Sequence, residues 1–164
     1  MTMTKDIRIG LIGAGYIADW HADALAATPG VRISAICDPR DAAARALARQ
    51  HGAETFTTVD SLIAANACDA VHILTPPNLH ESIAIQCLSA GLHTLVEKPV
   101  AESAEATRRM ADCAAQAGVC FAPGHNFLGL PSYCVMKDAM QAGEYGRIHT
   151  AEIIWALPLA PLRS

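Results

Sequence analysis

Charged residues are scarce in this sequence, and its basic residues are not clustered. Asp, Glu, Lys and Arg make up 17% of the 164 residues, and the formal net charge is −4. Binding to the phosphates of a nucleic acid needs Lys and Arg gathered on one surface. The composition therefore argues against a nucleic-acid partner.

Long apolar runs are absent as well. No stretch approaches the length of a membrane span, and the first residues, MTMTKD, lack the apolar core of a secretion signal. We therefore expect no membrane contact and a cytoplasmic location. The six cysteines include no C-x-x-C pair, which argues against a zinc site and favours reduced thiols. No bound metal is expected.

What the sequence does contain is a regular alternation of two patterns. Short, continuously apolar runs alternate with longer alanine-rich stretches, which is typical of an α/β fold with a doubly wound parallel sheet covered on both faces. The predicted strands are Ile7–Ile12, Val31–Cys37, Thr55–Thr57, Ala70–Thr75, His93–Glu97 and Val119–Ala122. The predicted helices are Tyr16–Ala27, Arg40–His51, Ser61–Ala65, Asn78–Ala90 and Ser103–Ala117.

The pattern changes after about Ala122. We expect one domain over residues 1–123, and over 124–164 a linker, a helix at Ser132–Ala142 and a strand at Arg147–Leu157. One helix and one strand are too little to bury themselves, so this part reads as the start of an incomplete α+β domain. An apolar strand without a sheet is a template for pairing, and we therefore expect a homo-oligomer formed through residues 147–157.

The first strand leads into a glycine-rich turn. The segment Gly13–Ala18, GAGYIA, fits the pattern G-x-G-x-x-G/A and lies between a strand and a helix. Gly13 would allow the tight turn, and Gly15 would let the backbone approach a pyrophosphate at the helix N-terminus. A plain glycine-containing corner is the alternative.

An acidic residue ends the second strand. The carboxylate of Asp38 can accept hydrogen bonds from an adenosine ribose and repels a 2′-phosphate, which favours NAD over NADP. A helix N-cap is the alternative role for Asp38. Arg40 could stack on adenine or reach a 2′-phosphate, so NADP stays open.

Two further motifs follow strands that should end at the same rim of the sheet. TPPNLH places Thr75, Asn78 and His80 there, unless it is only a proline-led helix carrying a surface histidine. EKP places Glu97 and Lys98 there, and a lysine can donate to a substrate oxygen or assist proton transfer. The alternative is a strand end that leaves two charges in solvent.

Taken in order, GLIGAGYIA, CDPR, ILTPPNLH and VEKP resemble the Gfo/Idh/MocA oxidoreductase family. PGHNFLGLP and GEYGRIHTAEI resemble that family's domain junction and the first strand of its second domain. The resemblance covers nearly the whole chain. It implies a Rossmann-like NAD(P)-binding domain, the very start of a C-terminal domain, and a dehydrogenase acting on a sugar, cyclitol or related polyol.

The resemblance also implies roles for individual residues. Lys98 would be catalytic by contacting the reacting hydroxyl, and the Lys98–Pro99 bond is a candidate cis peptide. Leu128 stands where many members carry Arg, so the substrate contacts at the junction are not defined. The implied cofactor-binding residues are Gly13, Gly15, Tyr16 and Ile17 at the pyrophosphate, Asp38 and Arg40 at the adenosine, Thr75, Pro76, Asn78 and His80 along the cofactor path, and Glu97, Lys98 and Asn126 near the nicotinamide.

Most of the substrate domain of that family has no counterpart in this sequence. We therefore expect NAD, or alternatively NADP, to bind, with weak or absent turnover by this chain alone. A non-catalytic dinucleotide-binding module or subunit is one alternative. A different NADP-dependent reductase with a similar first domain is another.

Overall fold

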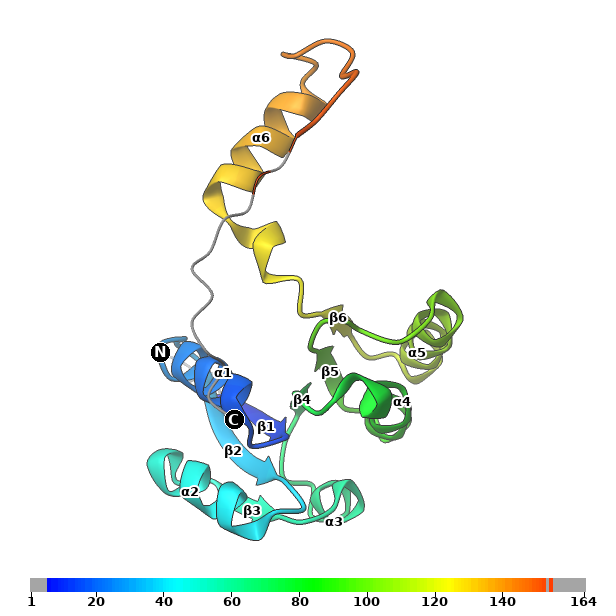
Figure 1. Ribbon diagram of the computed structural model, residues 1–164. Helices are drawn as coiled ribbons and strands as arrows, with labels where there is room; N and C mark the ends of the chain where they lie inside the picture. The colour runs from blue at the N-terminus through cyan, green and yellow to red at the C-terminus, as the bar shows by residue number, and fades with distance from the viewer. Residues whose placement is uncertain (1–5, 153, 155–164) are drawn as a thin grey trace, which may run out of the picture. The chain divides into compact units, whose positions relative to one another are not determined.

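The computed structural model describes residues 6–152 and 154. Its centre is a six-stranded sheet in the order β3-β2-β1-β4-β5-β6, in which every neighbouring pair is parallel (Figure 1). The predicted Rossmann-like α/β fold is thus confirmed. The strands are β1 (Ile7–Ile12), β2 (Val31–Cys37), β3 (Glu54–Phe56), β4 (Ala70–Ile73), β5 (His93–Val96) and β6 (Phe121–Pro123).

Helices connect the strands and cover both faces of the sheet. The α-helices are α1 (Tyr16–Ala26), α2 (Asp41–His51), α3 (Val59–Ala64), α4 (His80–Ser89), α5 (Ala104–Ala117) and α6 (Pro131–Gln141). Two short 3-10 segments, η1 (Pro77–Leu79) and η2 (Asn126–Gly129), complete the described elements.

Two apolar layers hold the helices to the sheet. On one face, alanines of α1 and α2 pack against residues of β1 and β2, including Leu11 and Ile36. On the other face, α3, α4 and α5 contribute Leu62, Leu88 and Met110 to a second buried cluster. Because both faces are covered, the central strands carry apolar residues towards both faces, with no simple alternation of apolar and polar residues.

The last strand of the sheet starts later than the sequence pattern suggests. Gly118 caps α5 in the left-handed conformation, and the N–H of Val119 donates to the Ala114 carbonyl at 3.1 Å. Val119 therefore finishes the helix cap, and β6 begins at Phe121 instead of at the predicted Val119.

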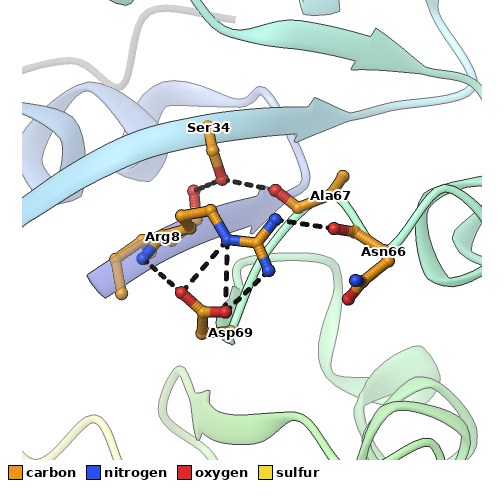
Figure 2. A network of polar contacts seen from close by, with 6 residues as sticks. Arg8, Ser34, Asn66, Ala67 and Asp69 are labelled. Carbon is orange, nitrogen blue, oxygen red and sulfur yellow. Dashed lines mark hydrogen bonds and ion pairs between the residues drawn. The ribbon is translucent and has the colours of Figure 1, made fainter. Parts of the chain in front are cut away.

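A polar network fastens the start of β1 to the segment before β4 (Figure 2). The Arg8 guanidinium donates to the Asp69 carboxylate through Nε at 3.2 Å and Nη2 at 2.7 Å, and to the Asn66 carbonyl at 2.8 Å. The Arg8 N–H donates to the same carboxylate at 2.8 Å, and the Ser34 hydroxyl donates to the Ala67 carbonyl at 2.7 Å. Paired charge-assisted bonds of this kind fix orientation as well as distance.

The chain divides into two compact units, Met1–His125 and Asn126–Ser164. In the described part of the second unit, regular structure is limited to η2 and α6. The predicted strand Arg147–Leu157 is wrong over residues 147–152 and at 154, which form no strand, and the rest of it lies outside the described residues. A strand needs a neighbouring strand to take up its backbone hydrogen bonds, and none is paired with these residues.

Among residues 6–152 and 154, none of the helices combines the length and the hydrophobicity required to cross a bilayer.

The Arg8 network yields a stability prediction. Arg8→Met keeps the aliphatic stem but leaves the Asp69 carboxylate without its guanidinium, so we expect thermal unfolding to begin several degrees lower. Arg32→Met is the matched control, because Arg32 is the exposed register partner of Arg8 on β2. Differential scanning calorimetry measures both variants. Equal midpoints for the two would contradict a stabilising role for the network.

Candidate functional site

The strand order creates a crevice between β1 and β4. From β1 the chain moves outward through β2 and β3, and it then returns to the other side of β1 to build β4, β5 and β6. At such a switch point the loops after the two central strands diverge, and ligands bind beyond the carboxyl ends of the strands. The glycine turn follows β1 and the TPP motif follows β4, so both lie at this crevice.

Gly13 is required by the close approach of two backbones. Its φ is +102°, a conformation that side-chain-bearing residues rarely adopt, and its N–H donates to the Cys37 carbonyl at 2.8 Å. A Cβ at Gly13 would lie 2.9 Å from the carbonyl carbon and oxygen of Leu74. Only glycine lets the β1–α1 turn lie against the backbone that leaves β4.

Gly15 differs, because protein packing does not demand it. It is the N-cap of α1 with an extended backbone, and a Cβ there would meet no atom within 4 Å. No side chain caps the first turn of α1, whose leading N–H groups belong to Tyr16 and Ile17. The helix N-terminus therefore faces open space with free donors and a positive dipole end, which suits an anion.

Asp38 is a buried carboxylate tied to the glycine turn. It is 4% exposed, and its two oxygens accept the Ala14 N–H and the Arg40 N–H, both at 2.8 Å. Nε and Nη2 of Arg40 each donate to it at 3.0 Å. Burial alone would raise the pKa of Asp38, but the hydrogen bonds from Arg40 and Ala14 outweigh it and lower the pKa. Asp38 is ionised at neutral pH.

The N-cap role considered for Asp38 is wrong. Helix α2 begins at Asp41, and its N-cap is Arg40, whose own side chain makes no capping bond to the first turn. The Asp38 carboxylate instead accepts hydrogen bonds from the glycine turn and from the Arg40 guanidinium. Because the glycine turn lies at the crevice between β1 and β4, Asp38 lies there too.

A cavity of about 740 Å³ opens over these loops. Thr75, which lines it, has a buried hydroxyl oxygen that finds no hydrogen-bond partner among the described residues. Buried polar groups in folded proteins nearly always have a hydrogen-bond partner, and a bound ligand could be the partner of this hydroxyl. The lining residues come from every loop at the carboxyl edge of the first four strands: Ile12, Gly13, Gly15, Tyr16, Ile17, Cys37, Asp38, Pro39, Arg40, Thr57, Thr58, Val59, Leu74, Thr75, Pro76, Leu79 and Ile83.

The one thiol in the cavity wall belongs to Cys37. Burial raises its pKa to about 11, and the neighbouring Asp38 charge acts in the same direction. Since the thiolate is the nucleophilic form, this cysteine is unreactive at neutral pH and contributes only apolar surface.

His80 does not line this cavity. It is 1% exposed, with Nδ1 at 2.9 Å from the Pro99 carbonyl and Nε2 at 2.8 Å from the Thr75 carbonyl. The alternative of a surface histidine is therefore wrong. Both ring nitrogens therefore lie within hydrogen-bond distance of a backbone carbonyl. His80 ties the TPP loop to the EKP loop.

The EKP segment lies on the neighbouring strand end. The Glu97 N–H donates to the Ile73 carbonyl at 3.0 Å, which fixes the segment beside the end of β4. The expected cis Lys98–Pro99 bond is confirmed. Glu97 accepts the Lys98 N–H at 2.8 Å and contacts Nε2 of His21 at 3.2 Å.

Eight of the predicted cofactor residues line the cavity together, and five do not. Asn78 is exposed in η1, and Asn126 belongs to the second unit. The residues that line the cavity are Gly13, Gly15, Tyr16, Ile17, Asp38, Arg40, Thr75 and Pro76, whereas Asn78, His80, Glu97, Lys98 and Asn126 are outside it. Among the described residues, no group of three or more side chains could hold a metal ion.

Several site residues escape the sequence interpretation. Thr57 and Thr58 come from the β3–α3 loop and Val59 is the first residue of α3; the only signal in the sequence is a pair of threonines after a weak strand. His21 and His72 carry no motif at all. Only the folded structure shows that these two side chains are in contact, because it places α1 beside β4.

Comparison with known proteins gives a consistent picture. The profile of the Gfo/Idh/MocA family, described as "Oxidoreductase family, NAD-binding Rossmann fold", matches residues 7–125. An inositol 2-dehydrogenase of Corynebacterium glutamicum (strain R) is 34% identical over 154 residues, covering 89% of this chain and 44% of that protein. A 1,5-anhydro-D-fructose reductase of Ensifer adhaerens is also 34% identical, over 94% of this chain and 46% of its own length.

A solved structure agrees. The WlbA dehydrogenase from Bordetella pertussis, in complex with NADH and UDP-GlcNAcA, superposes with a TM-score of 0.84 at 32% identity. The match covers 88% of this chain and 42% of that one. The chain thus spans less than half the length of the relatives it matches.

The two glycines of the turn predict losses of stability that differ in size. Gly13→Ala places a Cβ against the Leu74 carbonyl at an unfavourable φ, which costs about 1–3 kcal/mol from the backbone conformation alone. Gly15→Ala has space and a permitted φ, so we expect a loss of about 1 kcal/mol or less. Urea unfolding of both variants checks the difference. Similar losses would refute the packing role of Gly13.

Proposed function

Because the chain belongs to the Gfo/Idh/MocA family of oxidoreductases with an NAD-binding Rossmann fold, we propose that its cavity binds NAD. We propose further that the whole protein transfers a hydride between NAD and a hydroxyl-bearing carbon of a sugar, cyclitol or related polyol. The observation that carries this is the open N-terminus of α1 beside a cavity lined by Thr75, whose buried hydroxyl has no hydrogen-bond partner among the described residues. The names of the relatives, which include an inositol dehydrogenase and a sugar reductase, support the substrate class.

At the adenosine end, Asp38 would accept hydrogen bonds from the ribose hydroxyls. Its four acceptor positions are occupied by the N–H groups of Ala14 and Arg40 and by the Arg40 guanidinium. The Arg40 side chain is 68% exposed, so it can swing outward and release two of them. Binding would therefore exchange the guanidinium for ribose hydroxyls and free Arg40 to cover the adenine.

At the pyrophosphate, the backbone of Gly15, Tyr16 and Ile17 would supply N–H donors at the helix N-terminus. The Thr75 hydroxyl would gain the partner that it otherwise lacks. Pro76 would line the same path, and its missing N–H leaves no unsatisfied donor there.

At the reacting end, bound NAD supplies the hydride acceptor, and the protein sets distance and charge. Lys98 would orient and polarise the substrate hydroxyl as the catalytic residue, and its neighbour Glu97 would contact the nicotinamide ribose. On the basis of the family resemblance, Asn78 and Asn126 would also contact the cofactor. His80 would act indirectly, by holding the TPP and EKP loops together.

A dinucleotide-binding module without turnover is the second candidate. The chain spans 44% of the C. glutamicum relative, so most of that protein has no counterpart here. Incubating the chain with NAD and a panel of polyols distinguishes the two, since NADH formed by the chain alone would reject the module. We place either version in the cytoplasm, on the cysteine argument above and on six cysteines that are all unpaired.

Cofactor binding can be tested directly. We expect the chain to bind NADH and to prefer it over NADPH by about tenfold, because the Asp38 charge repels a 2′-phosphate. Gly15→Val should weaken NADH binding about tenfold or more by filling the space before α1, while leaving the chain folded. NADH fluorescence titration and circular dichroism measure both. No binding by the unsubstituted chain at millimolar NADH would refute the proposal.

We also propose a homo-oligomer. The support is an apolar surface on α6, where Val135, Met136 and Met140 are 68%, 45% and 45% exposed. The substitutions Met136→Glu and Met140→Lys together place an ion pair one helical turn apart, which α6 should tolerate. We expect a dimer or larger assembly in sedimentation equilibrium, shifted towards monomer by the double variant. If the unsubstituted chain is monomeric at about 100 µM, the proposed homo-oligomer is wrong. The proposal that the chain binds NADH is unaffected by that result.

A further inference from the structure

Three ionisable side chains from three different elements form a line that ends at the EKP segment. His72 lies on β4, His21 lies on α1, and Glu97 directly follows β5. Nδ1 of His72 is 2.9 Å from Nδ1 of His21, and Nε2 of His21 is 3.2 Å from Oε1 of Glu97. The two rings meet edge to face, with centroids 5.1 Å apart. The line therefore connects the helix that follows the glycine turn with the Glu97 carboxylate.

The surroundings fix the direction of these hydrogen bonds. Burial, and secondarily the nearby His21, lower the pKa of His72 to about 4, so its ring is neutral and carries a single N–H. An ionised carboxylate only accepts, so His21 must donate from Nε2 to Glu97. A neutral His21 then presents a lone pair at Nδ1, and His72 must carry its proton on Nδ1 to satisfy it.

We propose that His72 and His21 form a polarised hydrogen-bond chain, His72 Nδ1–H to His21 Nδ1 and His21 Nε2–H to Glu97, that positions the EKP segment for the cofactor. Both histidines are positioning residues, since each acts through Glu97. The functional part of this inference rests on the proposed NAD binding. The direction of the hydrogen bonds is independent of the proposed NAD binding.

The Glu97 carboxylate has two further neighbours, the Lys98 N–H and Gly124. Its Oε2 accepts the Lys98 N–H at 2.8 Å, so an orientation imposed on Glu97 passes directly to the Lys98 backbone. A Cβ at Gly124 would lie 3.2 Å from the Glu97 Cα and 3.3 Å from Oε1, which leaves the side chain little room to move. The side chains of His21 and Glu97 are only 17% and 13% exposed. Loss of the His21 donor would therefore remove the hydrogen bond that His21 makes to Oε1.

The first test needs no cofactor. Nitrogen-15 NMR of histidine-labelled protein at about pH 8, above the ordinary titration range of histidine, reports which ring nitrogen carries each proton. We expect the Nδ1–H tautomer for His72 and the Nε2–H tautomer for His21. An Nε2–H tautomer for His72 would overturn the proposed direction.

The second test measures NADH affinity and the backbone amide resonance of Lys98. His21→Phe should weaken NADH binding about tenfold, the size expected for one charge-assisted hydrogen bond, and shift the Lys98 amide signal. His21→Gln can still donate to Glu97 and should recover most of the affinity. His51→Phe on α2 is the matched control and should alter neither measurement. Unchanged affinity and an unchanged Lys98 signal in His21→Phe would overturn the positioning role.

The two proposals fail in distinguishable ways. If the unsubstituted chain binds no NADH, the proposed function fails, while the tautomers and the Lys98 signal still decide the hydrogen-bond chain. If NADH binds equally well to the unsubstituted chain and to a folded His21→Phe, NAD binding stands and the positioning role fails. If His21→Phe does not fold, the tautomers test the hydrogen-bond chain and the NADH affinity of His21→Gln tests the positioning role.

Discussion

The close contact between the turn after β1 and the backbone leaving β4 is the constraint on which the rest of the site depends. Gly13 lies against the Leu74 carbonyl with no room for a side chain, and the Leu74 N–H donates to the Ile12 carbonyl at 2.8 Å. This contact sets how near the glycine turn comes to Thr75. Were the two backbones further apart, the N-terminus of α1 and Thr75 would not line the same cavity.

Buried ionisable side chains then hold the surrounding loops by their backbones. Asp38 accepts N–H groups from the glycine turn and from the start of the next loop. His80 bridges the carbonyls of Thr75 and Pro99, and Glu97 accepts the Lys98 N–H. Because these bonds are already made in the protein by itself, the loops are organised before any ligand arrives, which lowers the entropy that binding must overcome. Arg40, with its exposed side chain, is the element that can move.

Local signals predicted the sheet well and the ends of elements less well. The bounds of β1 and β2 were confirmed to the residue, because each is a predominantly apolar run that is followed by a turn. The predicted start of β6 was wrong, since Val119 completes the cap of α5. The strand at Arg147–Leu157 was wrong over its described residues for a different reason. Its apolar pattern describes what the segment could do beside a partner strand, and no such partner is paired with it.

By itself the sequence determined the parallel α/β fold, the family, and the four motifs that follow the strands, because periodicity and glycine spacing are local properties of a chain. Only the tertiary structure decided what those motifs touch. It turned the histidine of TPPNLH inward onto two carbonyls, and it made Asp38 a tether for the glycine turn instead of a helix cap. It also brought His21 and His72 to Glu97, from helix and strand positions far apart in the chain. Contacts of this kind depend on which elements the sheet order makes neighbours, and no local pattern carries that information.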